Sequence, residues 1–287
     1  MRTSRMRIVV MEKLDLGGLI LEARSTGGIE STYRLPKLRI LFDIGRCPAG
    51  SDRYPTLFLS HSHIDHSAGL PYYVSLRSLK KMAPPTVYCP AECRDDLQKM
   101  LNSWVPLDAD ADHCKLIGVK AGDEIPLKNS CFVRAFASPH RVPVRGYTVY
   151  QRKHRLKSEL QGEDATQIAE RARAGEKVKE EVVHAEFCFP GDTLIDNIEK
   201  EKSITQARVL LLECTFAGES ISVERARKAG HIHLDQIAER AHLFENETIL
   251  LTHWSQRYSN KQIEREVKKA LPESLRSRVK IIFPIRF

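Results

Sequence analysis

The sequence predicts an α/β domain in which two β-sheets pack face to face with helices on their outer sides. Strand-like apolar runs alternate with amphipathic helical segments in both halves of the chain, and no change of composition marks a linker between the halves. The 287 residues, 42% of them hydrophobic, are enough to bury a sizeable core. We therefore expect one domain over residues 1–287, interrupted by a single charged excursion.

The elements are expected in a regular order. Residues 7–43 alternate short apolar stretches with Gly-Gly and Pro breaks, which is typical of an opening β-meander. After it we expect strands at 57–59, 86–89, 132–138, 145–151, 185–189, 208–212, 248–251 and 279–283, and helices at 68–82, 91–101, 223–228, 234–243 and 260–270.

Composition excludes several classes of protein. Seven cysteines, an odd number without a Cys-x-x-Cys pair, argue for reduced thiols and against a disulfide scaffold or an all-cysteine zinc site. The apolar runs are too short to cross a bilayer, so we expect no membrane partner. Arg2, Arg5 and Arg7 leave an organellar address open, but a cytoplasmic protein is the default expectation. The net charge of +8 weakly favours binding to polyanions.

Four potential metal ligands follow the buried run at 57–59: His61, His63, Asp65 and His66. In an extended segment side chains alternate, so His61 and His63 point to one side as a pair. Asp65 and His66 fall where the chain turns toward the next helix and could serve a second ion nearby. Imidazoles with a carboxylate suit zinc, with iron or manganese as alternatives. Ordinary polar loop residues would not be expected to place four potential metal ligands within six positions.

Three later residues also come just after predicted strands: His140, Asp192 and His253. Loops at strand ends are where a rigid sheet can hold ligands that are distant in sequence. Each residue alone could be a core or capping group, but together they complete a set for two metals. The expected arrangement has His61, His63 and His140 on one ion, Asp65, His66 and His253 on the other, and Asp192 bridging.

Other polar residues have more than one interpretation. Asp43 either caps a turn or holds a metal-bound histidine from behind. His231 follows a glycine in a loop and could serve as an acid or a phosphate contact. His233 is undecided. Surface positions are expected for His113, His154, His184 and His242.

Residues 153–183 break the pattern of the chain. The segment has seven basic and seven acidic residues, and its middle, 163–174, predicts a helix with little apolar face. The basic residues come first, with Arg152, Lys153, Arg155 and Lys157 close together. A solvated surface excursion is the plain interpretation.

Together these motifs resemble the metallo-β-lactamase fold, through His61-Ser-His-Ile-Asp-His66, His140, Gly191-Asp-Thr193 and His253. More narrowly, Gly230-His231 and Leu251-Thr-His-Trp-Ser-Gln-Arg-Tyr258 resemble the ribonuclease Z family, the tRNA 3′-processing endonucleases. The 42–48, 79–85, 213–216 and 230–233 stretches are similar to its short plant-type form.

The resemblance implies a four-layer αβ/βα sandwich, two zinc ions per chain, a homodimer, and a flexible arm that clamps tRNA. Residues 153–183 occupy the arm's position, so Arg152, Lys153, Arg155 and Lys157 become expected RNA contacts. It also implies a zinc-dependent endoribonuclease that removes the 3′ trailer from precursor tRNA by two-metal hydroxide attack, leaving a 3′-hydroxyl. Asp65 would take the proton of the attacking water, His231 would protonate the leaving 3′ oxygen or contact the phosphate, and Glu213 would orient His231.

Two other functions fit parts of the pattern. Another hydrolase of the same fold, either a small-molecule phosphodiesterase or a thioesterase of the glyoxalase II kind, would share the seven ligands but has no use for His231 and the basic start of the arm. An RNA-binding protein with a degenerate site would not be expected to keep all seven ligand positions filled.

Overall fold

The computed structural model describes residues 11–110 and 112–285. It contains two seven-stranded sheets packed face to face. The first sheet runs in the order β1 Glu12–Leu16, β2 Leu19–Thr26, β3 Glu30–Leu35, β4 Ile40–Phe42, β5 Thr56–Phe58, β6 Thr86–Pro90 and β7 Lys115–Val119. The second runs β14 Val279–Ile281, β13 Thr248–Thr252, β12 Val209–Glu213, β11 Lys179–Phe189, β10 Val144–Leu156, β9 Cys131–Ser138 and β8 Glu124–Pro126.

The two sheets share one plan. In each, the first four strands along the chain pair antiparallel, and the last four pair parallel. Parallel pairing requires crossovers, and helices supply them on the outer faces. These are α1 Ile64–Ser67, α2 Leu70–Leu79 and α3 Arg94–Trp104 on the first sheet, and α5 Asn197–Lys200, α6 Lys202–Gln206, α7 Val223–Ala229, α8 Leu234–Glu239, α9 Asn260–Ala270 and α10 Glu273–Arg276 on the second.

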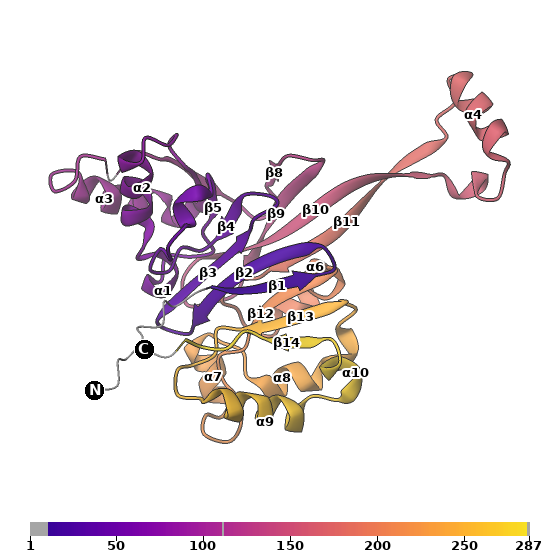
Figure 1. Cartoon of the computed structure of the whole chain (residues 1–287). Coiled ribbons are helices and arrows are strands. Elements are labelled where there is room, and N and C mark those ends of the chain that lie inside the picture. Colours follow the sequence, from indigo (N-terminus) through magenta and orange to yellow (C-terminus); the bar gives the residue numbers. More distant parts are fainter. Residues whose placement is uncertain (1–10, 111, 286–287) are drawn as a thin grey trace, which may run out of the picture.

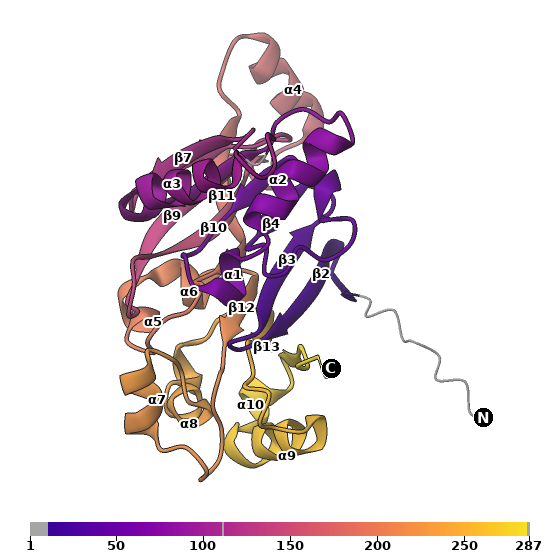
Figure 2. The ribbon, with the colours of Figure 1, turned by 90° about the vertical axis from the view of Figure 1, so that its left-hand side faces the viewer.

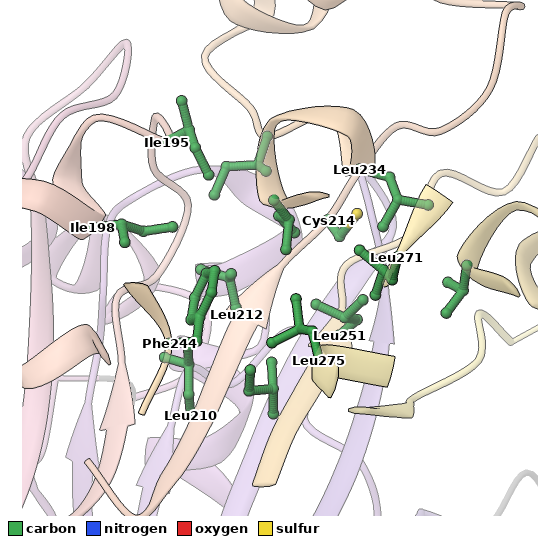
Figure 3. Close-up of a cluster of buried hydrophobic side chains, with 14 of the residues drawn as sticks. Ile195, Ile198, Leu210, Leu212, Cys214, Leu234, Phe244, Leu251, Leu271 and Leu275 are labelled. Atoms are coloured by element: carbon green, nitrogen blue, oxygen red, sulfur yellow. The ribbon is translucent and has the colours of Figure 1, made fainter. Parts of the chain in front are cut away.

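Three apolar clusters make the four layers. One lies between the sheets and includes Tyr33, Phe42 and Phe187. A second packs α2 and α3 on the first sheet. The third packs the later helices on β12 and β13, with Leu212 and Leu251 at its centre (Figure 3). The expectation of two packed sheets with helices outside is confirmed.

Local sequence explains where several elements begin and end. β12 reads Val-Leu-Leu-Leu-Glu with every residue buried, as a central parallel strand must be. α9 begins at a capping box in which the side chains of Ser259 and Gln262 each bond the other's backbone N–H. α7 ends at Gly230, whose φ of 87° is the left-handed conformation that glycine adopts without steric cost.

The segment expected to be an excursion is a long projecting hairpin (Figure 1). β10 and β11 stay paired as far as Leu156 and Lys179, and α4 Ala165–Arg173 lies at the far end. We call residues 153–183 the arm. The central helix predicted at 163–174 is confirmed, but the strands on both sides of it were missed. Apolar and polar residues do not alternate in these strands, because neither face of the hairpin packs on a hydrophobic core.

One expected helix has different bounds, and two strands were missed. The helix predicted at 68–82 spans Leu70–Leu79, and a separate turn, α1, already begins at Ile64, so that Asp65 and His66 are helical. β7 and β8 were not predicted, since their short exposed-and-buried mixtures give little signal. Residues 7–10 of the opening meander lie outside the described residues. Within the described ranges, no helix has the length and apolarity of a membrane span.

Candidate functional site

The candidate ligands gather at one end of the sandwich, after the C-terminal ends of strands from both sheets. His61 and His63 follow β5, and Asp65 and His66 lie in α1. His140, Asp192 and His253 follow β9, β11 and β13. α1 lies between the two halves of the molecule, on the side opposite to the arm (Figures 1 and 2).

The first group contains His61, His63, His140 and Asp192. Nδ1 of His63 lies 3.0 Å from Nε2 of His61 and 3.3 Å from Nε2 of His140. Oδ2 of Asp192 is 3.7 Å from the His61 Nε2 and 4.0 Å from the His140 Nε2. Burial lowers the pKa of all three imidazoles, which keeps them neutral and able to donate lone pairs.

The second group contains Asp65, His66 and His253. The two Nε2 atoms of His66 and His253 are 3.2 Å apart, and Oδ2 of Asp65 is 3.5 Å and 3.3 Å from them. Asp192 borders this group as well, with Oδ2 3.4 Å from His66 Nε2 and Oδ1 3.6 Å from His253 Nε2. Asp192 therefore lies between the two groups, with one carboxylate facing histidines of both.

Hydrogen bonds behind the rings orient four of the histidines. Nδ1 of His66 lies 2.6 Å from Asp43 Oδ2, and Nδ1 of His140 lies 2.7 Å from the Gly230 carbonyl oxygen. Nδ1 of His61 is 2.9 Å from Ser60 Oγ. In His253 the partner at 2.9 Å is Thr215 Oγ1. With a proton on each Nδ1, the Nε2 lone pairs face the centre of the site.

The two hydroxyl partners are themselves held by buried carboxylates in the same way. Ser60 Oγ donates to Asp43 at 2.8 Å, and Thr215 Oγ1 donates to Glu213 at 2.7 Å. Because each hydroxyl proton is committed to a carboxylate, each oxygen can only accept from the histidine behind which it lies. Each sheet thus contributes one histidine–hydroxyl–carboxylate chain. Of the two interpretations of Asp43, its contact with His66 favours the one in which it orients a metal-binding histidine.

The residues present fit a pair of divalent cations. Two nitrogens that bind one tetrahedral zinc are about 3.3 Å apart. The nitrogen pairs within each group measure 3.0, 3.3 and 3.2 Å. Lone pairs that face one another at such distances in a buried site need a cation between them. The carboxylate of Asp192 gives the same indication, because burial acts against its charge and a bound cation would offset that cost.

A glycine loop supports the second group from the side of the first sheet. The Gly28 N–H donates to Asp65 Oδ2 at 2.8 Å, and the Gly27 N–H donates to the Trp254 carbonyl at 3.0 Å. A Cβ on Gly27 would come 2.7 Å from the His253 carbonyl oxygen, so only glycine fits there. His253 itself has φ 63°, an uncommon conformation for a residue other than glycine.

His231 lies at the mouth of the site. Its side chain is 17% exposed, whereas those of His61, His66, His140 and His253 are 0–3% exposed. Its Nδ1 is 3.1 Å from Glu213 Oε1 and 3.9 Å from Asp192 Oδ2. Burial acts against a charge on His231, but the Glu213 carboxylate outweighs burial and raises the pKa of the imidazole to about 9.

The remaining histidines lie away from this centre. His233, undecided from the sequence, is buried at the N-cap of α8, where its ring bonds the Asp235 N–H and the Gly218 carbonyl. His113, His154, His184 and His242 are exposed, as expected.

Sequence reasoning missed Ser60, Thr215 and the Gly27-Gly28 loop. Two of them carried a local signal, since Ser60 precedes His61 and Thr215 follows Glu213 by two positions.

The four cations expected to contact RNA lie along the paired strands of the arm and just past their outer end, and each has a carboxylate partner. Arg155 pairs with Glu180 at 2.7 Å and Lys153 with Glu186 at 3.3 Å. The Arg152 guanidinium lies 3.6 Å from Glu124, and Lys157 lies 3.5 Å from Glu159.

Comparison with known proteins agrees with this geometry. A family model described as a beta-lactamase superfamily domain matches residues 46–254. A tRNase Z of Arabidopsis thaliana is 39% identical over 94% of this chain and 98% of its own length. The chain belongs to the tRNase Z family of the beta-lactamase superfamily. A chloroplastic tRNase Z of the same plant is 33% identical over 89% of this chain and 73% of its own length.

Solved structures support the tRNase Z fold. The short form of human tRNase Z has a TM-score of 0.56 with 21% identity, over 83% of this chain and 93% of that one. A metallo-beta-lactamase fold protein from Bacillus subtilis has a TM-score of 0.60 with 14% identity, over 92% and 95% of the two chains. The expected resemblance to ribonuclease Z is confirmed. The thioesterase and small-molecule phosphodiesterase alternatives are not favoured, since the relatives that match most of the chain are tRNase Z enzymes.

Proposed function

We propose that this protein is a metal-dependent endoribonuclease that removes the 3′ trailer from precursor tRNA, and that it holds two zinc ions. The observation that carries the proposal is the pair of adjoining ligand groups with Asp192 between them. His61, His63 and His140 would hold one ion, Asp65, His66 and His253 the other, and Asp192 would touch both. When bound, the two cations would polarise the scissile phosphate and make a water acidic enough to attack at neutral pH.

We assign to Asp65 the role of accepting the proton of the attacking water. Its Oδ2 is tied to the Gly28 N–H and faces His253 Nε2, which holds the carboxylate in one orientation. The interactions with His253 and His66 outweigh burial and hold its pKa below the usual range, so Asp65 is ionised before the reaction. The water oxygen bonds to phosphorus, and its proton passes to Asp65.

We assign to His231 the role of protonating the leaving oxygen. The raised pKa of about 9 keeps the imidazole protonated at neutral pH, and Nδ1 is committed to Glu213. Nε2 has no partner among the described residues, so its proton is available to the substrate. As the bond from phosphorus to the 3′ oxygen breaks, that oxygen takes the proton, which leaves a 3′-hydroxyl on the tRNA and a 5′-phosphate on the trailer.

The arm supports a large RNA substrate through its far end. Arg173 and Lys177 are exposed there and Lys179 is exposed where β11 begins, and no ion pair joins the three to any residue that the structure describes. The Arg171 guanidinium pairs with Glu163 at 2.9 Å and Glu176 at 2.7 Å, which closes the chain around α4. We place the arm's phosphate contacts on the three free cations, because the four cations that the sequence suggested already have carboxylate partners.

We also propose a homodimer. Tyr72 and Leu79, which are 60% and 77% exposed, lie seven residues apart on the same side of α2, and Ile64, 76% exposed, lies in the preceding helix α1. Exposed apolar residues that gather on one face mark interaction surfaces. Light scattering on the wild-type protein and on Tyr72→Glu tests this, since the substitution would convert a dimer to a monomer.

The reducing cytosol is the compartment we propose, because the seven cysteines are all unpaired in the part of the chain that the structure describes. An organelle is the alternative, since one relative is chloroplastic.

The deciding experiment is cleavage of a 3′-extended tRNA transcript by the purified protein, with the cut mapped to the nucleotide. A cut at the 3′ end of the tRNA body that leaves a 3′-hydroxyl is expected. Asp65→Ala should abolish the cut while folding and tRNA binding persist. Wild-type protein that hydrolyses a thioester but leaves the transcript intact would contradict the proposal.

A further inference from the structure

Arg141 lies at the border of the candidate active site. It follows His140 in the loop between β9 and β10, is exposed, and makes no hydrogen bond or ion pair with a described residue. A Cβ on Gly230 would come 3.0 Å from Arg141 Cγ, so the aliphatic part of this side chain lies against the residue that precedes His231. The side chain therefore starts beside the mouth, and no carboxylate of a described residue pairs with its charge.

Arg257 borders His231 from another loop. Its Cζ lies 5.6 Å from the centre of the Phe216 ring, and its Nε donates to Ser255 Oγ at 3.1 Å. The Phe216 ring in turn meets the His231 ring edge-on, with centres 6.0 Å apart. The side chain is therefore braced by a ring and a hydroxyl, while no carboxylate in the described part of the chain pairs with it.

Neighbouring arginines show that this lack of a partner is not general. The guanidinium of Arg145 binds Glu92 at 2.6 Å, that of Arg227 binds Asp196 at 2.7 Å, and that of Arg240 binds Glu199 at 2.8 Å. Each of these three arginines is thus neutralised by a carboxylate, in contrast to Arg141 and Arg257. Arg141 and Arg257 keep a free charge next to the residue that faces the leaving oxygen.

We propose that Arg141 and Arg257, which both border His231, bind phosphates of the RNA chain next to the scissile bond. This inference rests on the proposed function and adds to it the reason for selecting a polynucleotide. A guanidinium group matches two oxygens of a phosphate, and a braced side chain loses less entropy when it binds. A small phosphodiester has only the phosphate that is cleaved, so it gains nothing from the two arginines.

The test compares two substrates across matched variants. Arg141→Ala, Arg257→Ala and the double variant are assayed on a 3′-extended tRNA and on bis-p-nitrophenyl phosphate. Each single variant is expected to lower kcat/KM for the tRNA by about tenfold or more, as loss of a charged hydrogen bond does. Hydrolysis of bis-p-nitrophenyl phosphate should stay within about twofold of wild type, because the same contacts are absent there. Arg141→Lys should recover part of the loss by keeping the charge.

Salt dependence separates a phosphate contact from a structural effect. Each phosphate contact adds about one to the slope of log affinity against log salt, so each alanine variant should lower that slope by about one. Arg53→Ala is the control. Arg53 is exposed in the turn at Ser51–Arg53, at the opposite end of β5 from His61, and should change neither quantity.

Three outcomes would overturn the inference: equal losses on both substrates, an unchanged salt slope, or an Arg53→Ala effect as large as that of Arg141→Ala. Binding of labelled 3′-extended tRNA, followed by fluorescence anisotropy, keeps the test separate from the proposed function. If wild-type protein binds but does not cleave the RNA, and the arginine variants weaken binding with a lower salt slope, the proposed function fails and the phosphate contacts stand. Unaltered RNA binding in the arginine variants would refute the proposed phosphate contacts.

Discussion

Asp43 Oδ2 lies 2.6 Å from Nδ1 of His66, and both side chains are fully or almost fully buried. The same carboxylate accepts the Ser60 hydroxyl, which accepts from His61. One carboxylate therefore orients a histidine of each ligand group, so its influence on the site is larger than its distance from the mouth suggests.

Asp43→Asn should weaken metal binding by about 10–100-fold, the usual cost of losing a carboxylate behind a ligand histidine. Asparagine tolerates the φ of 54° at this position, so the backbone should stay in place. Competition against a chromophoric chelator measures the affinity. Asp52→Asn is the control, since Asp52 is also buried but pairs with Lys80 away from the site. Wild-type affinity in Asp43→Asn would show that the contact is incidental.

His231→Ala should slow cleavage by roughly 10²–10⁴, the contribution of a positioned acid, while the metal content stays at the wild-type value. The Nδ1 of the imidazole lies 3.9 Å from Asp192 Oδ2 but only 3.1 Å from Glu213 Oε1, which suits an acid better than a ligand. Single-turnover cleavage and elemental analysis of the same preparation check both parts. If the metal is lost along with the activity, His231 is a ligand.

Gly27→Ala should damage the site more than its size suggests. The new Cβ would meet the His253 carbonyl oxygen at 2.7 Å, so the loop that holds Asp65 must shift. We expect lower metal affinity together with a lower Tm. Gly122→Ala serves for comparison. Its φ of 94° makes alanine strained by about 1–2 kcal/mol, but nothing lies within 4 Å, so it should cost stability alone. Equal metal affinity in both variants would refute the expectation.

Replacing Arg173, Lys177 and Lys179 with alanine should raise KM for precursor tRNA by about tenfold or more and leave bis-p-nitrophenyl phosphate unaffected. Replacing Arg152 and Arg155 should matter less, because Glu181 and Glu180 lie beside them. Deletion of residues 158–178 gives the upper limit of the effect. If replacing Arg152 and Arg155 has the larger effect, the RNA contacts lie on the four cations that the sequence alone suggested.

Chelation should lower the Tm, and added zinc should restore it. A ligand that binds only the folded state stabilises it by mass action, and this site brings buried lone pairs and the Asp192 carboxylate together. Differential scanning fluorimetry before and after dialysis against a chelator measures the shift. A Tm indifferent to metal would count against two tightly held ions.

Much of the fold was accessible from the sequence because buried parallel strands are continuous apolar runs. β12 and β13 are of this kind, and both were predicted within a residue at each end. The strands of the arm were not, since Arg152, Lys153 and their neighbours have no core beneath them and no period to read. β8 is three residues long and mostly exposed, so its sequence has too few apolar residues to predict a strand.

Residue chemistry and spacing by themselves determined the candidate ligands, because metal-binding side chains are rare enough that a cluster at strand ends is informative. Only the tertiary structure decided how they are oriented. The hydroxyls of Ser60 and Thr215, the carbonyl of Gly230 and the N–H of Gly28 direct the ligands through hydrogen bonds from other parts of the chain. The same holds for charge: the sequence shows which side chains are cationic, but whether Arg155 is neutralised and Arg141 is not depends on which carboxylates the fold brings within 4 Å.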